Sequence, residues 1–184
     1  NPSDDTYFHT SVFKHAKNRI MWLLILMLSS TVTGILISKY ENAFAAIPIL
    51  VSFIPMIMGT GGNCGSQSAT LIIRGLAIDE IRSRDFFRVI GKETLVALLV
   101  GLALAIANGI RIMIQYHQLR LSIVIGLTIM VTVLMSKLMG CMLPLVAKKL
   151  KLDPALMAAP LITTIVDTCS ILVYFSIATR VFQL

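Results

Sequence analysis

Residue 167 is an aspartate within an apolar segment, and its charge is the clearest sign of chemistry in this chain. Residues 154–179 contain no other charged side chain. A carboxylate at membrane depth is strongly destabilising unless it meets a cation, a proton or water. Asp167 is therefore a candidate functional residue. The structural alternative is a carboxyl group bonded only to nearby hydroxyls or to Lys137.

The same segment supplies further oxygen atoms that suit a hard cation. Pro160 has no N–H group, so the carbonyl of Leu156 loses its helical partner. Thr163, Thr164 and Thr168 add hydroxyl groups near the acid. None of the three histidines lies in an apolar segment. Oxygen donors without histidine favour Mg²⁺ over zinc or copper, and Mg²⁺ is typically held through few carboxylates and retained waters.

A second polar surface lies within the uncharged residues 43–73. At helical spacing, one face carries small or polar residues: Gly59, Asn63, Gln67, Thr70 and Arg74. Such a face can pack closely against another membrane helix, or it can line a water-filled path with amides and exposed carbonyls. The density of glycine and amide residues favours the second interpretation, and both stay open at this point.

Composition places these residues in a multi-pass membrane protein. The chain has 184 residues, of which 57% are hydrophobic and 14% charged, and its mean hydropathy is +0.86. A bilayer core of ~30 Å needs ~20 apolar residues per helix. We therefore predict an all-α protein of the cell membrane, with residues 1–19 as a cytoplasmic linking helix and residues 20–182 as a five-helix domain in the lipid bilayer. The predicted spans are about 20–38, 43–73, 94–111, 120–147 and 154–180.

The distribution of basic residues predicts the orientation of these helices. Most of them precede the first span, join the second to the third, or join the fourth to the fifth. By the positive-inside rule the N-terminus is cytoplasmic and the C-terminus lies outside. The net charge of +7 is therefore a sign of membrane topology, and we expect no nucleic-acid partner. One buried acid per chain and only five helices favour a homodimer, in which two copies of Asp167 face each other.

Two motifs resemble the MgtE-type magnesium channels, which are related to the animal solute carrier family 41 transporters. Residues 59–77, GTGGNCGSQSATLIIRGLA, are similar to the signature of the second helix, and residues 153–178 are similar to the last helix. The resemblance covers about residues 18–182.

The resemblance implies a homodimeric, Mg²⁺-selective channel with five helices per protomer. It makes Asp167 the pore carboxylate and the Thr163 backbone carbonyl a second ligand. It also implies regulatory Mg²⁺ binding by two acids at the cytoplasmic face, Asp153 and Glu93. Members of this family usually carry an N-terminal cytosolic domain and CBS domains, which this chain does not include. With the residues noted above, the expected lining of the pore is Gly59, Asn63, Gln67, Leu156 and Thr164.

Two alternatives to a passive channel remain. One is an ion-coupled carrier that exchanges Mg²⁺ against Na⁺ or H⁺. The other is an intramembrane aspartyl hydrolase, but that chemistry needs two carboxylates sharing a site, and only Asp167 is expected at depth. We therefore predict a transporter and no enzyme. A lysine lining the pore would oppose cation conduction, so Lys137 is expected to face a neighbouring helix or the cytoplasmic end.

Overall fold

The protein is a bundle of long helices in the computed structural model, which describes residues 11–151 and 154–183. Only the backbone is described for residues 18, 43, 44, 83 and 154–160. Five helical segments are long and apolar enough to cross a membrane, and the described residues contain no strand. The prediction of an all-α protein with five spans is confirmed. In chain order the helices are α1 (Val12–Lys39), α2 (Glu41–Ala46), the 3₁₀ helix η1 (Pro48–Phe53), α3 (Ile54–Ala77), the 3₁₀ helix η2 (Ser83–Asp85), α4 (Phe86–Tyr116), α5 (Leu119–Lys149) and α6 (Pro154–Phe182).

The residues of the predicted second span, about 43–73, form three consecutive helical segments. The short helix α2 ends at Ala46, and η1 and then α3 follow it. Pro48 and Pro55 each stand in the first turn of a helix. Proline is tolerated there because the first N–H groups of a helix have no intrahelical partner. The two prolines therefore mark where one helix stops and the next begins.

The helices next to the connections extend further than hydropathy predicts. α1 begins at Val12, capped by the Ser11 hydroxyl, which accepts a hydrogen bond of 3.3 Å from the Lys14 backbone N–H. The described part of the expected linking helix therefore continues directly into the first span. α4 begins at Phe86 and not near residue 94, so Glu93 lies inside a membrane-spanning helix. That Glu93 binds a regulatory Mg²⁺ at the cytoplasmic face stays a prediction.

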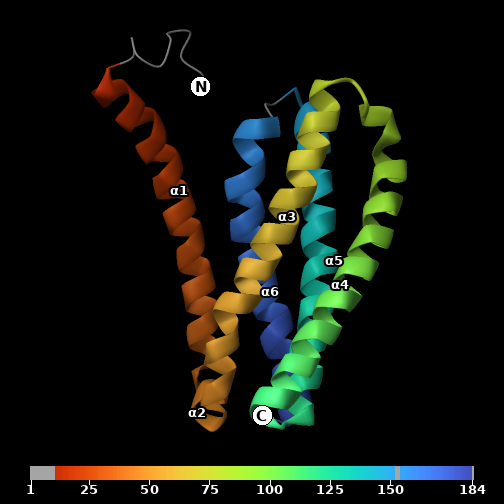
Figure 1. Ribbon diagram of the computed structural model, residues 1–184. Helices are drawn as coiled ribbons and strands as arrows, with labels where there is room; N and C mark the ends of the chain where they lie inside the picture. Colours follow the sequence, from red (N-terminus) through yellow and green to blue (C-terminus); the bar gives the residue numbers. More distant parts are fainter. Residues whose placement is uncertain (1–10, 152–153, 184) are drawn as a thin grey trace.

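The basic segments of the chain lie at one end of the bundle (Figure 1). The start of α1, the connection from α3 to α4 and the end of α5 share that end, while the α1–α2 and α4–α5 connections and the C-terminus lie at the other. This arrangement is the one that the positive-inside argument requires. Which end faces the cytoplasm stays a prediction.

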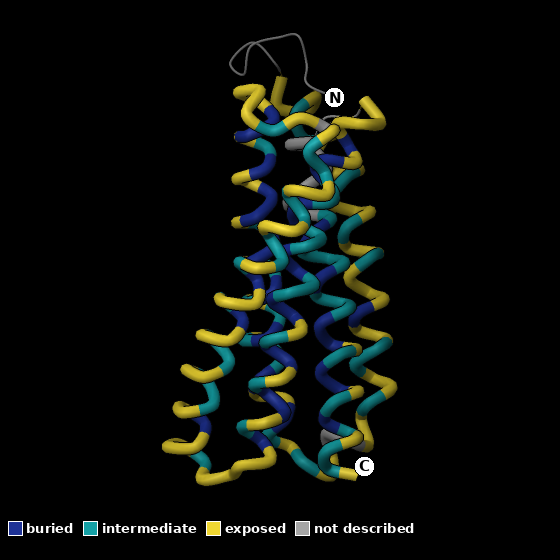
Figure 2. Tube along the Cα trace, turned by 90° about the vertical axis from the view of Figure 1, so that its right-hand side faces the viewer, coloured by how far each residue is buried: buried dark blue, intermediate teal, exposed yellow. Residues whose placement is uncertain are grey.

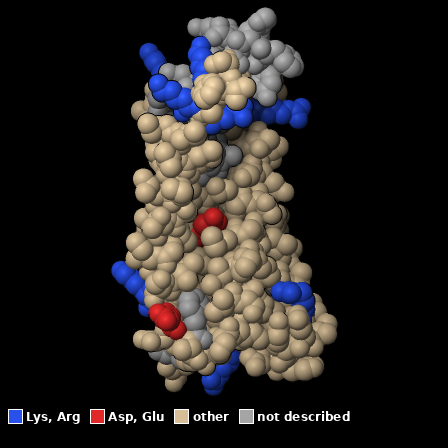
Figure 3. All heavy atoms as spheres, turned by 90° about the vertical axis from the view of Figure 1, so that its left-hand side faces the viewer, with Lys and Arg blue, Asp and Glu red and all other residues tan. Residues whose placement is uncertain are grey.

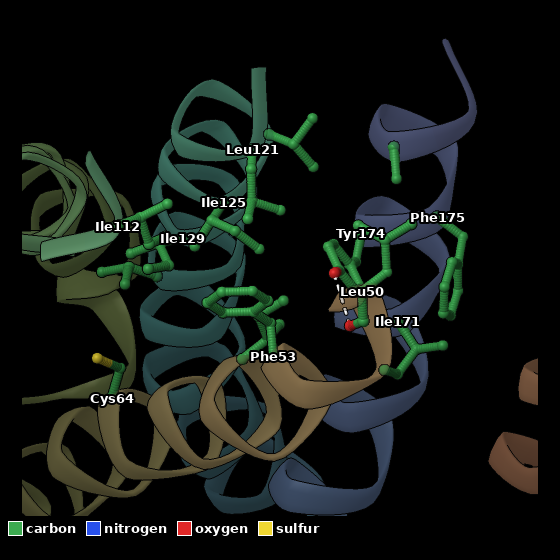
Figure 4. Close-up of a cluster of buried hydrophobic side chains, with 14 residues drawn as sticks. Leu50, Phe53, Cys64, Ile112, Leu121, Ile125, Ile129, Ile171, Tyr174 and Phe175 are labelled. Carbon is green, nitrogen blue, oxygen red and sulfur yellow. Dashed lines mark hydrogen bonds between the residues drawn. The ribbon is translucent and has the colours of Figure 1, made fainter. Parts of the chain in front are cut away.

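The buried residues lie on the sides of the helices that face the inside of the bundle, and the exposed residues lie on the outer sides (Figure 2). The largest cluster surrounds η1, where Leu50 and Phe53 pack against α5 and α6 (Figure 4). There the Tyr174 hydroxyl donates a hydrogen bond of 2.8 Å to the Leu50 carbonyl oxygen. A carbonyl at membrane depth needs such a partner because no bulk water is available. This bond fixes α6 to the start of the second span.

Helix α1 is the least enclosed part of the bundle. It packs chiefly against α6 and α2, and Thr33 is its only buried residue among the side chains that the structure describes. Its exposed residues are mostly large and apolar. Such a surface suits contact with lipid or with another apolar helix.

Candidate functional site

Asp167 lies within α6 and is half-buried. The described part of the chain offers its carboxylate no hydrogen bond and no ion pair. The structural alternative, in which nearby hydroxyls or Lys137 satisfy the acid, is therefore not what the structure has. On one face of the protein, an acidic group stands in the middle of a broad uncharged band, with basic side chains at the ends (Figure 3).

The backbone of α3 approaches α6 very closely beside this acid. A Cβ atom built on Gly61 would lie 2.7 Å from Cγ1 of Val166, and one built on Gly65 would lie 2.6 Å from Cγ2 of Ile162. A Cβ on Gly62 would lie 3.5 Å from Cγ2 of Thr163. Only glycine allows an approach this close. α3 therefore passes α6 within one helical turn of Asp167.

A third helix reaches α6 at the residue after Asp167. The Thr33 and Thr168 hydroxyl oxygens, on α1 and α6, are 2.7 Å apart. Thr168 Oγ1 donates a hydrogen bond of 3.0 Å to the Thr164 carbonyl oxygen, so Thr33 is the donor between the two hydroxyls. Two helices, α1 and α3, thus contact α6 at residues adjacent to Asp167 or one turn before it.

The polar face predicted for the second span exists, and the described part of the chain leaves it uncovered. Gly59, Asn63 and Gln67 are all exposed, and no atom lies within 4 Å of a Cβ built on Gly59. The packed face, on the opposite side of α3, includes Gly61, Gly65 and Ser68. The shared face is confirmed, and the prediction that it lines a pore stays a prediction.

The other predicted site residues are placed as follows. Thr163 and Thr164 are half-buried one turn before Asp167. Leu156 belongs to α6, but its side chain lies outside the described part. Asp153 lies outside the described residues.

Glu93 belongs to a hydrogen-bonded group that sequence reasoning did not find. Ser68 on α3 donates a hydrogen bond of 2.7 Å to Glu93 Oε2 on α4. Lys137 Nζ on α5 donates one of 3.4 Å to Ser68 Oγ. Lys137 is only 4% exposed, so it faces neighbouring helices as expected. No sequence pattern joins these three residues, because each lies on a different helix.

In the part of the chain that the structure describes, the donors near Asp167 do not form a complete set of metal ligands. Among the described residues, no group of three His, Cys, Asp or Glu side chains could hold a metal ion together. Around Asp167 the chain offers hydroxyl and carbonyl oxygens. Such a set suits a hard cation that keeps most of its water.

Comparison with known proteins gives the family of this chain. Residues 54–177 match the MgtE family model, described as a divalent cation transporter. The magnesium transporter MgtE of Thermus thermophilus is 40% identical over 160 residues, which are 87% of this chain and 35% of that protein. The Bacillus subtilis protein of the same name is 33% identical over 175 residues, or 95% of this chain and 39% of the relative.

A third relative, from Enterococcus faecalis, is 36% identical over 165 residues, covering 90% of this chain and 36% of the relative. The chain thus spans between a third and two fifths of the length of these curated relatives. The predicted class, a transporter and not an enzyme, agrees with the family. The family match covers both glycine-rich α3 and the acid of α6, and this multi-pass membrane chain belongs to the MgtE family of divalent cation transporters.

Proposed function

We propose that this chain is the membrane part of a magnesium transporter, and that the Asp167 carboxylate is the main protein ligand of the transported ion. The observation that carries the proposal is the half-buried position of Asp167 within a membrane helix, without a described hydrogen-bond or ion-pair partner. A carboxylate in this place is stable when a cation or water compensates its charge. The relatives named as magnesium transporters indicate which cation that is.

The ion would be held as hydrated Mg²⁺ between two copies of the chain. One carboxylate per chain is too little charge for a divalent cation, and a two-fold axis beside Asp167 supplies the second. The exposed face of α3 would then line the path together with α6. In this proposal, the Thr163 carbonyl contacts the hydrated ion, and five further residues line the path: Gly59, Asn63, Gln67, Leu156 and Thr164.

Conduction would be passive, with the N-terminus in the cytoplasm. Asp153, which precedes α6, would bind a regulatory Mg²⁺ at the cytoplasmic end, as the family resemblance implies. A sodium or proton gradient would leave the initial rate of Mg²⁺ uptake into liposomes unchanged. An uptake rate that rises with either gradient would contradict a passive channel and favour the ion-coupled carrier.

The test of the ion site is the variant Asp167→Ala, measured by Mg²⁺ uptake into liposomes per amount of dimeric, folded protein. We expect uptake to be abolished, because Asp167 is the single acidic residue of α6. Asp167→Glu keeps the charge and should keep partial uptake. Glu80→Ala removes an exposed acid of the α3–α4 connection and should change nothing. Normal uptake by Asp167→Ala would overturn the proposal.

A further inference from the structure

Three helices are joined by a chain of hydrogen bonds that the ion site does not explain. The chain runs from Lys137 on α5 to Ser68 on α3 and on to Glu93 on α4, with distances of 3.4 and 2.7 Å. We call these three residues the lysine relay. Ser68 is fully buried and Lys137 is 4% exposed. A lysine at this depth is stable only when a negative group offsets its charge.

The geometry gives each member of the lysine relay a distinct task. The ammonium group of Lys137 can only donate, and the carboxylate of Glu93 can only accept. The Ser68 hydroxyl accepts a hydrogen bond from Lys137 and donates one to Glu93, so it links the two charged groups. The relay is therefore electrically neutral as a whole, although each charged end alone would not be.

A second bond holds α3 on the same side. The Ser136 hydroxyl, one residue before Lys137, donates to the Gly61 carbonyl oxygen. Gly61 and Ser68 are two helical turns apart on the packed face of α3. Between them Gly65 lies against the backbone of Gly140. α5 thus holds α3 at two points, and two points on one face determine the rotation of a helix about its axis.

We propose that the lysine relay is a positioning device which sets the rotation of α3 and so directs its exposed polar face toward the transported ion. With 3.6 residues per turn, Asn63 and Gln67 lie on the side of α3 opposite to Gly65 and Ser68. Glu93 acts here as the counter-charge of Lys137. This inference rests on the proposed function in one respect, namely that the polar face of α3 contacts a transported ion. It gives Glu93 a different task from the regulatory Mg²⁺ binding that the family resemblance implies.

The relay predicts an asymmetry between its two charged ends. Glu93→Gln leaves Lys137 almost fully buried without a counter-charge. Lys137→Met leaves Glu93 half-buried and still bonded to Ser68. It should therefore disturb the orientation of α3 less than Glu93→Gln does. The double variant Glu93→Gln/Lys137→Met removes both charges and should restore the orientation of α3 that Glu93→Gln disturbs. Replacing a whole buried ion pair is often tolerated, while breaking it is not.

The first measurement reports the rotation of α3 without using transport. A Gln67→Cys reporter is placed in a protein whose three native cysteines, Cys64, Cys141 and Cys169, are replaced by alanine. The rate of its reaction with a charged methanethiosulfonate reagent is then measured in liposomes. Glu93→Gln should slow the reaction at least ~10-fold, whereas the double variant should stay within ~3-fold of the parent. Glu80→Gln, which removes an exposed acid at the same end of the bundle, is the control.

The second measurement is Mg²⁺ uptake per amount of folded protein, over a range of Mg²⁺ concentrations. Glu93→Gln should raise the half-saturating concentration, and Lys137→Arg should behave as the parent. A double variant as impaired as Glu93→Gln would show that Glu93 acts on the ion directly, and the inference would be overturned. Unchanged labelling in Glu93→Gln would overturn it as well. The Asp167→Ala result is independent: normal uptake there would reject the proposed ion site and leave the labelling test of the relay intact.

Discussion

The Thr33 hydroxyl of α1 lies 2.7 Å from the Thr168 hydroxyl of α6, one residue after the candidate ion ligand. Thr33 is 5% exposed, on a helix whose other described side chains face outward or are only partly covered. Helix α1 is thus hydrogen-bonded to α6 at the residue next to Asp167.

Thr33→Val keeps the shape of the side chain and removes the hydroxyl. We expect it to lower the stability of the solubilised protein by about 1 kcal/mol, the usual contribution of one hydrogen bond between membrane helices. Thermal unfolding in detergent measures this. Thr31→Val is the matched control, because the hydrogen bond that the described residues give the Thr31 hydroxyl lies within α1, to the Met27 carbonyl. Equal effects of the two substitutions would show that the α1–α6 bond adds nothing.

Gly140→Ala should be strongly destabilising. A Cβ on Gly140 would collide with the backbone carbonyl of Gly65, and a backbone atom cannot move aside without separating α3 from α5. Overpacking of this kind costs ~1–3 kcal/mol. The yield of folded protein after solubilisation measures it.

Gly91 is the control for Gly140, since it is also helical but has no atom within 4 Å of a built Cβ. Gly91→Ala should be neutral or stabilising by up to ~1 kcal/mol, because alanine favours the helix. A Gly140→Ala protein as stable as Gly91→Ala would contradict the close packing of α3 on α5.

Tyr174→Phe removes the hydroxyl that satisfies the Leu50 carbonyl oxygen at 2.8 Å. The expected loss is ~1 kcal/mol of stability, with the larger share arising from the carbonyl left without a partner. Tyr40→Phe is a suitable comparison, because the ring of Tyr40 stacks on Phe175 while the described residues give its hydroxyl no hydrogen bond. Denaturation of both proteins by detergent titration separates the hydroxyl from the ring.

Asn63→Ala should weaken Mg²⁺ transport much less than Asp167→Ala. An amide would act on a hydrated ion through water and without charge, so we expect a ~3–10-fold loss, which corresponds to one ordinary hydrogen bond. Uptake rates at saturating and low Mg²⁺ provide the measurement. Leu71→Ala, which changes an exposed apolar side chain of α3, should leave the Mg²⁺ uptake rate unchanged. A complete loss in Asn63→Ala would assign the amide a direct contact with the ion.

The sequence by itself determined the number of spans, the isolation of Asp167 and the common face of Gly59, Asn63 and Gln67. These follow from local rules, since an apolar run must match the bilayer and a helix repeats every 3.6 residues. The glycine-rich signature also pointed to the family that the comparisons support. Local rules failed at the ends of helices, where polar residues such as Glu93 continue α4 into the flanking region.

Only the tertiary structure decided which small residues of α3 are packed and which are free. Gly59 and Gly61 look alike in the sequence, yet only Gly61 is pressed against α5 and α6. The partner of Lys137 was likewise invisible, because Ser68 and Glu93 come to it from two other helices. Contacts of this kind depend on how side chains of separate helices pack into each other, and the residue pattern of a single helix does not predict such packing.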